Sequence, residues 1–238
     1  MTTQTEDSTN TGDARTLLIT GASTGIGAAT ARAAVADGWR VVLAARSLDK
    51  LQALASELGT DNALAVACDV TNWEQQQAAV AAAKQRFGKI DAVFANAGFG
   101  ATRGFLNESP EQWREMVLTN VLGVALTIRA TVEELRATRG HMLITGSMAG
   151  TRALPGSLYA ATKAAVHSIA EGLRLELDGS GVRTTLIAPG MTDTPFFDNR
   201  PTDALEDGDI ARAVLYALQQ PPHVDVNMIL IRPTAQNI

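Results

Sequence analysis

Short apolar runs alternate with longer alanine-rich windows along the chain from Arg15 onward. The apolar runs are rich in β-branched and aliphatic side chains, as strands buried on both faces are, and the windows between them are typical of helices. The predicted strands are Thr16–Thr20, Arg40–Ala45, Ala63–Cys68, Asp91–Ala95, His141–Thr145, Val182–Ala188 and Asn227–Ile231. The predicted helices are Gly25–Asp37, Leu48–Leu58, Trp73–Phe87, Pro110–Thr138, Ser157–Asp178 and Asp207–Gln220.

Strands that alternate with helices indicate repeated βα units and a parallel sheet. Right-handed crossovers then predict a Rossmann-type α/β fold, a doubly wound parallel sheet of about seven strands in the order 3-2-1-4-5-6-7 with helices on both faces. With 238 residues and 46% hydrophobic content the chain can bury one sizeable core, so residues 15–238 are expected to form a single domain. Residues 1–14 are polar, contain no apolar core and are predicted to be a disordered tail.

Charge and composition limit the classes of partner. The chain has a net charge of -5 and no basic stripe, which argues against nucleic acid and anionic membranes. No apolar run is expected to approach the ~20 residues that span a bilayer and no signal peptide is recognised, so a cytoplasmic location is expected. Cys68 is the only cysteine and the histidines, His141, His167 and His223, lie on separate elements, so no metal site is expected.

A glycine-rich turn directly follows the first predicted strand and opens the first helix. In Gly21-Ala22-Ser23-Thr24-Gly25-Ile26-Gly27, Gly21 allows a tight turn, Gly25 lets the backbone approach a pyrophosphate and Gly27 permits close helix packing. The free N–H groups of the helix N-terminus would hold the anion, with Ser23, Thr24 and Ile26 beside it. The spacing is GxxxGxG rather than GxGxxG, so the turn predicts a nucleotide site without identifying a family.

The end of the second strand indicates which nucleotide binds. A carboxylate there usually accepts hydrogen bonds from the ribose of NAD, whereas an arginine favours the 2′-phosphate of NADP. The chain has Ala45-Arg46-Ser47 at this point, which predicts NADP(H), with Arg46 and Ser47 holding the phosphate. The alternative is that Arg46 is a solvated loop residue. Asp69, followed by Val70, either meets the adenine edge or caps the turn after the third strand.

A serine, a tyrosine and a lysine form the candidate catalytic group. Ser147 falls just past the carboxyl end of the strand His141–Thr145, where open α/β sheets bind their ligands. Tyr159 and Lys163 are four residues apart, so they share one face of the following helix, which Ser157 is expected to cap. A phenol has a pKa of about 10, and Lys163 would supply the cationic help that lowers it. A chance surface pair is the alternative.

Together these motifs resemble the short-chain dehydrogenase/reductase family from Arg15 to Ile238. The resemblance implies an NADP-preferring oxidoreductase that moves a hydride between NAD(P)H and a carbonyl or alcohol, assembled as a homotetramer or dimer. It assigns catalysis to Asn120, Ser147, Tyr159 and Lys163, with Asn120 holding a water for the proton relay. Alone, Asn120 would be interpreted as a helix-surface residue. The cofactor residues implied in addition are Asn96, Ala97, Gly98, Tyr159, Lys163, Pro189, Gly190, Thr192 and Thr194.

Two departures from the family pattern leave the substrate open. Gly146 stands where a serine is frequent, and the segment Met191–Asp207 is shorter than the usual substrate-covering flap. Apolar candidates for a substrate cleft are Phe99, Ala149, Leu154, Met191, Phe196 and Phe197. These residues favour a broad NADPH-dependent carbonyl reductase that acts on a small-molecule ketone. The alternative is an NADP-dependent 3-hydroxy acid dehydrogenase, in which Arg152 would bind the carboxylate. A non-catalytic NADP-binding regulator is the third hypothesis.

Overall fold

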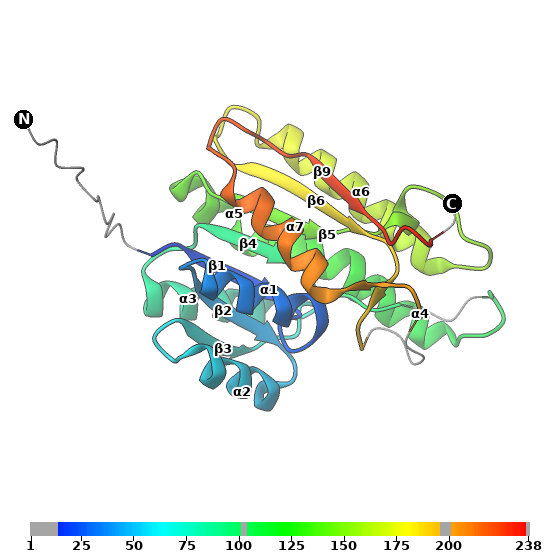
Figure 1. Ribbon diagram of the computed structural model, residues 1–238, viewed down its shortest axis with the longest axis horizontal. Helices are drawn as coiled ribbons and strands as arrows, with labels where there is room; N and C mark the ends of the chain where they lie inside the picture. Colours follow the sequence, from blue (N-terminus) through cyan, green and yellow to red (C-terminus); the bar gives the residue numbers. More distant parts are fainter. Residues whose placement is uncertain (1–13, 101–103, 196–200, 237–238) are drawn as a thin grey trace, which may run out of the picture.

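The computed structural model describes residues 14–100, 104–195 and 201–236, and these form a parallel sheet of seven strands (Figure 1). The order is β3-β2-β1-β4-β5-β6-β9, which confirms the predicted Rossmann-type topology. The last strand is β9 because two short strands, β7 (Thr192–Asp193) and β8 (Leu205–Glu206), pair with each other before it. The strands of the sheet are β1 (Thr16–Thr20), β2 (Arg40–Ala45), β3 (Ala63–Ala67), β4 (Ala92–Ala95), β5 (His141–Thr145), β6 (Arg183–Pro189) and β9 (Met228–Ile231).

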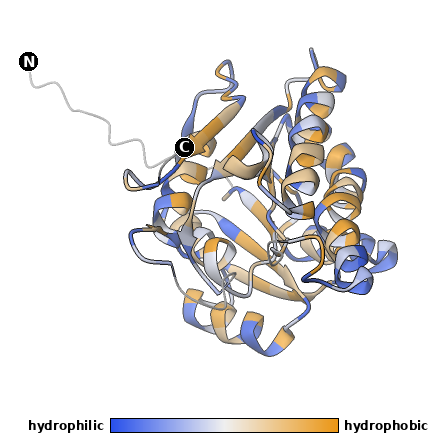
Figure 2. Ribbon diagram, turned by 90° about the vertical axis from the view of Figure 1, so that its right-hand side faces the viewer, coloured by the Kyte–Doolittle hydropathy of each residue, from blue (hydrophilic) through white to orange (hydrophobic). Residues whose placement is uncertain are grey.

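Helices cover both faces of the sheet (Figure 1). One face packs against α1 (Gly25–Ala36), α2 (Leu48–Leu58) and α7 (Asp207–Gln219). The other packs against α3 (Trp73–Phe87), α5 (Gly123–Thr138) and α6 (Leu158–Glu176). Hydrophobic residues follow the strands and the sides of the helices that face them (Figure 2).

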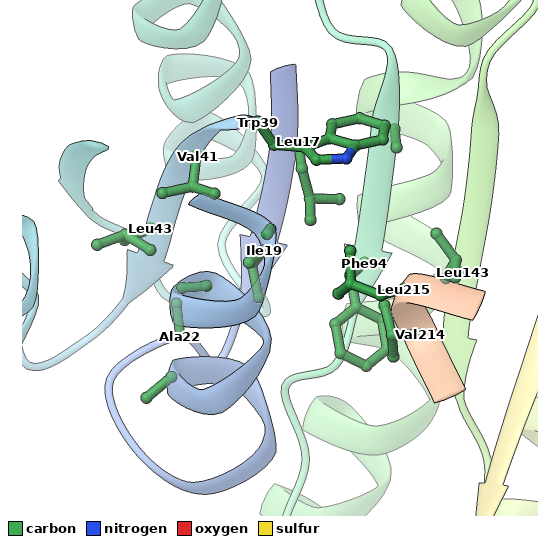
Figure 3. Packing of buried hydrophobic residues seen from close by; sticks show 14 of the residues in the cluster. Leu17, Ile19, Ala22, Trp39, Val41, Leu43, Phe94, Leu143, Val214 and Leu215 are labelled. Atoms are coloured by element: carbon green, nitrogen blue, oxygen red, sulfur yellow. The ribbon is translucent and has the colours of Figure 1, made fainter. Parts of the chain in front are cut away.

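The continuous apolar character of the strands follows from this two-sided burial. Successive side chains of a strand point to opposite faces, so Leu17 and Ile19 enter one cluster while Leu18 enters the other. All three are almost completely buried. Figure 3 shows part of the first cluster, to which both Phe94 of β4 and Val214 of α7 belong. The central strands are covered on both faces, so they need no polar positions, whereas the edge strand β9 is partly exposed.

The long helix predicted at Pro110–Thr138 is interrupted by a π-turn. It begins as α4 (Pro110–Val117), where Ser109 and Gln112 form a capping box, passes through a π-turn at Leu118–Leu122 and continues as α5. Its length and composition would allow it to cross a membrane, so the expectation that no apolar run approaches that length is wrong. In this fold α5 packs on the sheet, with Val124 and Leu135 in the core. Core packing therefore accounts for the buried part of its apolar side, while Val117, Leu118 and Leu122 are exposed.

A buried histidine stands at the start of β5. The side chain of His141 is 2% exposed, and its Nε2 lies 2.8 Å from Oγ1 of Thr185. Its Nδ1 is buried and has no hydrogen-bond partner among the residues that the structure describes. Burial, with a smaller effect from the charge of Arg183, lowers the pKa of His141 to about 3. The imidazole is therefore neutral in the folded protein.

We expect His141 to make the protein acid-sensitive. The unfolded chain binds a proton below about pH 6.5, whereas the folded pKa of about 3 keeps the native ring unprotonated. Stability from this residue is thus complete above pH 6.5 and is lost at roughly 1.4 kcal/mol per pH unit as pH falls toward 3. Glutamine cannot titrate, so the difference in free energy of unfolding between native protein and His141→Gln, measured by urea unfolding, should become smaller as the pH falls. The exposed His223→Gln is the control, and parallel pH profiles for His141→Gln and native protein would contradict the claim.

Candidate active site

A cavity of about 470 Å³ lies at the carboxyl ends of the strands and collects most of the residues that the sequence predicts for a site. Gly27 and Asn120 do not line it, and Phe196 and Phe197 lie outside the described residues. The predicted residues that do line it are Gly21, Ser23, Thr24, Gly25, Ile26, Arg46, Ser47, Asp69, Val70, Asn96, Ala97, Gly98, Phe99, Ser147, Ala149, Arg152, Leu154, Tyr159, Lys163, Pro189, Gly190, Met191, Thr192 and Thr194.

Other lining residues were not predicted for the site. Gln236, near the end of the chain, reaches the cavity because its Oε1 accepts a hydrogen bond from the backbone N of Met191 at 2.8 Å. No local pattern indicates this contact, since it joins residues far apart in sequence. Ala45, Cys68, Thr145 and Gly146 flank predicted residues and could have been inferred from their neighbours. The remaining additions are Gly100, Thr119, Met148, Ser157 and Pro195.

The glycine-rich turn has the tight geometry that its sequence predicts. Gly21 has a φ of +66°, and a Cβ on it would lie 2.8 Å from Cα of Ala97. A Cβ on Gly27 would overlap the carbonyl oxygen of Gly21, so Gly27 serves close packing beneath the turn. Thr24 is the N-cap of α1 but makes no side-chain cap hydrogen bond, and the first turn carries no acidic residue. The N-terminal N–H groups of α1 are thus available to an anion.

Asn96 ties together the ends of three strands. Its Nδ2 donates to the carbonyl oxygen of Thr20 at 3.1 Å, and its Oδ1 accepts from Oγ1 of Thr145 at 3.0 Å. The backbone N of Asn96 donates to Oγ1 of Thr20 at 3.0 Å. The ends of β1, β4 and β5 are therefore held at one level, and the turns that follow them start from fixed points.

The end of β2 presents a cation and a hydroxyl to the cavity. Arg46 is exposed, and Ser47, the N-cap of α2, makes no side-chain cap hydrogen bond. Asp69 caps the following turn, because its Oδ1 accepts from both N and Oγ1 of Thr71. Burial opposes ionisation of Asp69, but these bonds and the charge of Arg46 lower its pKa. The capping alternative for Asp69 is thus present in the structure, although Asp69 also lines the cavity.

Ser147 and Tyr159 meet through their side chains. Ser147 follows β5 in extended conformation, and its Oγ accepts from the backbone N of Ala149 at 3.1 Å. Ser157 caps α6 as predicted, accepting from N of Ala160, which places Tyr159 in the first turn. The Tyr159 hydroxyl makes a side-chain hydrogen bond with Ser147. Two groups that can donate a proton thus converge on one point of the cavity.

Burial controls the ionisation of Tyr159 and Lys163. It raises the pKa of Tyr159 to about 12, against a smaller lowering by the Ser147 hydrogen bond. It lowers the pKa of Lys163 to about 8, and Nζ of this residue donates to the carbonyl oxygen of Thr145 at 2.8 Å. Nζ lies 5.8 Å from the centre of the Tyr159 ring. The pKa of Tyr159 is therefore raised by burial, whereas a lowering by Lys163 was predicted.

Asn120 lies behind the cavity wall, within the π-turn. It is 1% exposed, so a helix-surface position is wrong. Its Nδ2 donates to the carbonyl oxygen of Phe99 at 2.9 Å and to Oγ1 of Thr162 at 3.2 Å, while its Oδ1 accepts from N of Phe99 at 3.0 Å. Asn120 therefore fixes the backbone of a lining residue and links it to α6. π-turns often occur at functional sites, and this one turns a polar side chain into the core.

Arg152 brings a cation to the wall of the cavity near Ser147. It lies in the loop between Ser147 and Tyr159, and Leu154 lines the cavity beside it in the same loop. Its Nε is buried and forms no hydrogen bond with any residue in the described part of the chain. Leaving a buried donor unpaired is costly, at about 1–3 kcal/mol, so this nitrogen is suited to an acceptor from outside the described residues, such as a bound ligand.

The doubly wound sheet, with a glycine-rich turn after its first strand, is that of a Rossmann-type nucleotide-binding protein. The family model described as short chain dehydrogenase matches residues 15–204. The chain belongs to the short-chain dehydrogenase family, whose members are oxidoreductases that use NAD(P)(H).

Known relatives and solved structures agree with this assignment. An uncharacterized oxidoreductase of Staphylococcus aureus (strain MRSA252) is 41% identical over 221 residues, which cover 91% of this chain and 96% of that protein. Alcohol dehydrogenase from the archaeon Thermococcus sibiricus, complexed with 5-hydroxy-NADP, is 33% identical with a TM-score of 0.88, covering 94% and 98% of the two chains. Serine dehydrogenase from Escherichia coli is 31% identical with a TM-score of 0.85, covering 94% and 100%.

Proposed function

We propose that this protein is an NADP(H)-dependent carbonyl reductase, acting as an alcohol dehydrogenase in the reverse direction. The observation that carries the proposal is the hydrogen bond between Ser147 and Tyr159, beside Lys163, in the cavity that the glycine-rich turn also lines. The cavity volume of about 470 Å³ is within the range of small-molecule sites. Similarity to an alcohol dehydrogenase complexed with an NADP derivative supports both parts of the proposal.

The residues of the cavity fit a dinucleotide phosphate. The N-terminus of α1, free of side-chain capping and of nearby acids, would hold the pyrophosphate. The guanidinium of Arg46 and the uncapped Ser47 hydroxyl would hold the 2′-phosphate of NADP. An arginine without a carboxylate at the end of β2 favours NADP over NAD. Thr192 and Thr194, buried after β6, would meet the nicotinamide end.

Three side chains would carry the proton chemistry. When bound, NADPH supplies the hydride that reduces the carbonyl carbon. Ser147 accepts from Ala149 at Oγ, which leaves its own hydrogen to donate to the carbonyl oxygen. Tyr159 then transfers its phenolic proton to that oxygen, producing the alcohol and a tyrosinate. The Lys163 ammonium stabilises the tyrosinate, and a proton from solvent restores the phenol.

The raised pKa of Tyr159 is consistent with reduction. A phenol with a pKa of about 12 remains protonated throughout the neutral range, so it is ready to act as a donor. Lys163, with its pKa lowered to about 8, is still largely charged at pH 7. As negative charge develops on the substrate oxygen and then on Tyr159, the buried ammonium of Lys163 would stabilise it by electrostatic attraction. A desolvated site strengthens this attraction.

Replacing Tyr159 by Phe should abolish reduction. The ring remains but the proton donor is lost, so turnover should fall by about a thousandfold or more while NADPH still binds. Loss of NADPH absorbance with a panel of aldehydes and ketones measures turnover, and fluorescence titration measures NADPH affinity.

Tyr216→Phe is the matched control, because Tyr216 is the other tyrosine of the chain and lies 55% exposed on α7. Near-native turnover in Tyr159→Phe would contradict the proposed proton donor. If native protein binds NADPH but reduces no carbonyl compound, the chain is a non-catalytic NADP-binding protein instead.

Changing Arg46 to Asp should shift the cofactor preference from NADPH toward NADH by tenfold or more, measured as the ratio of kcat/KM values. The substitution removes a charge-assisted hydrogen bond and sets a carboxylate against the 2′-phosphate. Lys50→Asp makes the same change of charge on α2 but at a position that does not line the cavity, so its preference should be nearly native. A native protein that already prefers NADH would contradict the assignment.

A second candidate function is an NADP-dependent 3-hydroxy acid dehydrogenase. The buried Nε of Arg152, which has no hydrogen-bond partner among the described residues, favours it, since a guanidinium in the wall of the cavity binds a carboxylate well. Serine, which the similar enzyme from Escherichia coli is named for, is itself a 3-hydroxy acid. Phe99, Leu154 and Met191 line the same cavity and favour a neutral aryl or alkyl ketone.

Arg152→Ala separates the two candidates. A broad carbonyl reductase should keep its kcat/KM for an aromatic ketone in this variant and show no preference for a small 3-keto acid. A 3-hydroxy acid dehydrogenase should prefer the keto acid and lose roughly a hundredfold in kcat/KM with Arg152→Ala, the worth of a hydrogen-bonded charge pair of about 2–3 kcal/mol. Arg152→Lys, which keeps the charge, should recover part of that loss.

A further inference from the structure

The imidazole of His167 fills a space beneath the turn that carries Ser147. His167 lies one helical turn beyond Lys163 on α6, on the same face. A Cβ on Gly146 would lie 2.7 Å from its Nε2, and a Cβ on Gly150 would lie 2.5 Å from the same atom. Neither glycine has a positive φ, so crowding and not backbone conformation opposes a side chain there. The ring crowds both positions, and at Gly150 a Cβ would also lie 2.8 Å from the carbonyl oxygen of Lys163. Gly146 is also the position where the family often has serine, and the Cβ of a serine would be too close to the ring in its present place.

The ring also faces the backbone of Ser147. Gly146 makes a sheet bond, its N donating to the carbonyl oxygen of Ile187 at 2.7 Å. The next donor, the N of Ser147, instead donates to Nε2 of His167 at 3.4 Å, a long hydrogen bond. Ser147 then turns so that its Oγ accepts from the N of Ala149. Ser147, whose hydroxyl is proposed to orient the carbonyl, is therefore held by two bonds. Its backbone N is bonded to His167, and its Oγ is bonded to the N of Ala149.

We propose that His167 is a positioning residue: its Nε2 accepts from the backbone of Ser147 and its ring supports the Gly146–Gly150 turn, so that the Ser147 hydroxyl faces Tyr159. This inference rests on the proposed function for its effect on turnover. His167 does not line the cavity, so it would act through Ser147 and not on the substrate.

The proposed role requires a neutral ring with its proton on Nδ1. Nε2 can accept a hydrogen bond only while it is unprotonated. Burial lowers the pKa of His167 and outweighs the raising effect of a backbone hydrogen bond with Ser147 that a protonated ring would donate, and the positive charge of Lys163 adds a further lowering. Gly146 and Gly150, which face the ring from the turn that carries Ser147, are uncharged. The surroundings of the ring therefore maintain the acceptor at neutral pH.

Two variants of similar size test the acceptor. His167→Leu keeps apolar volume but cannot accept, so kcat for an aromatic ketone should fall about tenfold, the equivalent of one lost hydrogen bond. The affinity for NADPH should be unchanged. His167→Gln can place an acceptor oxygen in the position of Nε2 and should recover most of kcat. Native kcat in both variants, or an equal loss in both, would overturn the proposal.

A spectroscopic test is independent of turnover. The chain has three histidines, so imidazole ¹⁵N spectra of the labelled protein contain few signals, and the His167→Gln variant identifies the one from His167. The signal should be that of a neutral ring protonated at Nδ1 at pH 7. A ring protonated at Nε2, or an imidazolium, would overturn the inference whether or not the protein is active. If the native protein reduces no ketone, the proposed function fails and this spectrum still decides the role of His167.

Discussion

Hydrogen bonds that hold neighbouring strand ends at one level are the constraint on which the site depends. Asn96 bonds to Thr20 and to Thr145, and Lys163 donates to the carbonyl oxygen of Thr145. These bonds lie where the sheet ladder stops, so they replace the ladder as the link between β1, β4 and β5. The glycine-rich turn, the Asn96–Gly98 segment and the Ser147 turn all start from this linked edge. Loss of one of these bonds would therefore disturb both the proposed phosphate site at the glycine-rich turn and the proposed carbonyl site at Ser147.

Desolvation sets the chemistry that this edge can perform. The same burial raises the pKa of Tyr159 and lowers that of Lys163, so each group moves toward its neutral form. The neutral phenol of Tyr159 lies beside the Lys163 ammonium, whose pKa is lowered. This pair suits a reaction in which negative charge appears only during the proton transfer. In water the same pair would interact weakly. The apolar core that stabilises the fold thus also strengthens electrostatic interactions at its edge.

The sequence predicted the strands and helices well because a sheet buried on both faces leaves a strong apolar signal. Bounds such as β6, expected at Val182–Ala188 and observed at Arg183–Pro189, differ by one residue. Contacts between distant segments carried no such signal, so the approach of Gln236 to Met191 was missed. The π-turn around Asn120 was missed as well, because one extra residue in a single turn changes the apolar pattern too little to be recognised over five residues. The pKa of Tyr159 could not be predicted, since burial of a side chain depends on every element around it.

The π-turn has a consequence for how the chain tolerates change in length. A π-turn closes its hydrogen bond over one more residue than an α-turn, so Leu118–Leu122 accommodates one extra position within an otherwise regular helix. Each residue of an α-helix turns the chain by about 100°. Removing that position would rotate α4 and the loop before it against α5, and it would carry Asn120 away from Phe99. A single-residue deletion here would change which side chains of the helix face the core. The same deletion in a surface loop would change only the length of the loop.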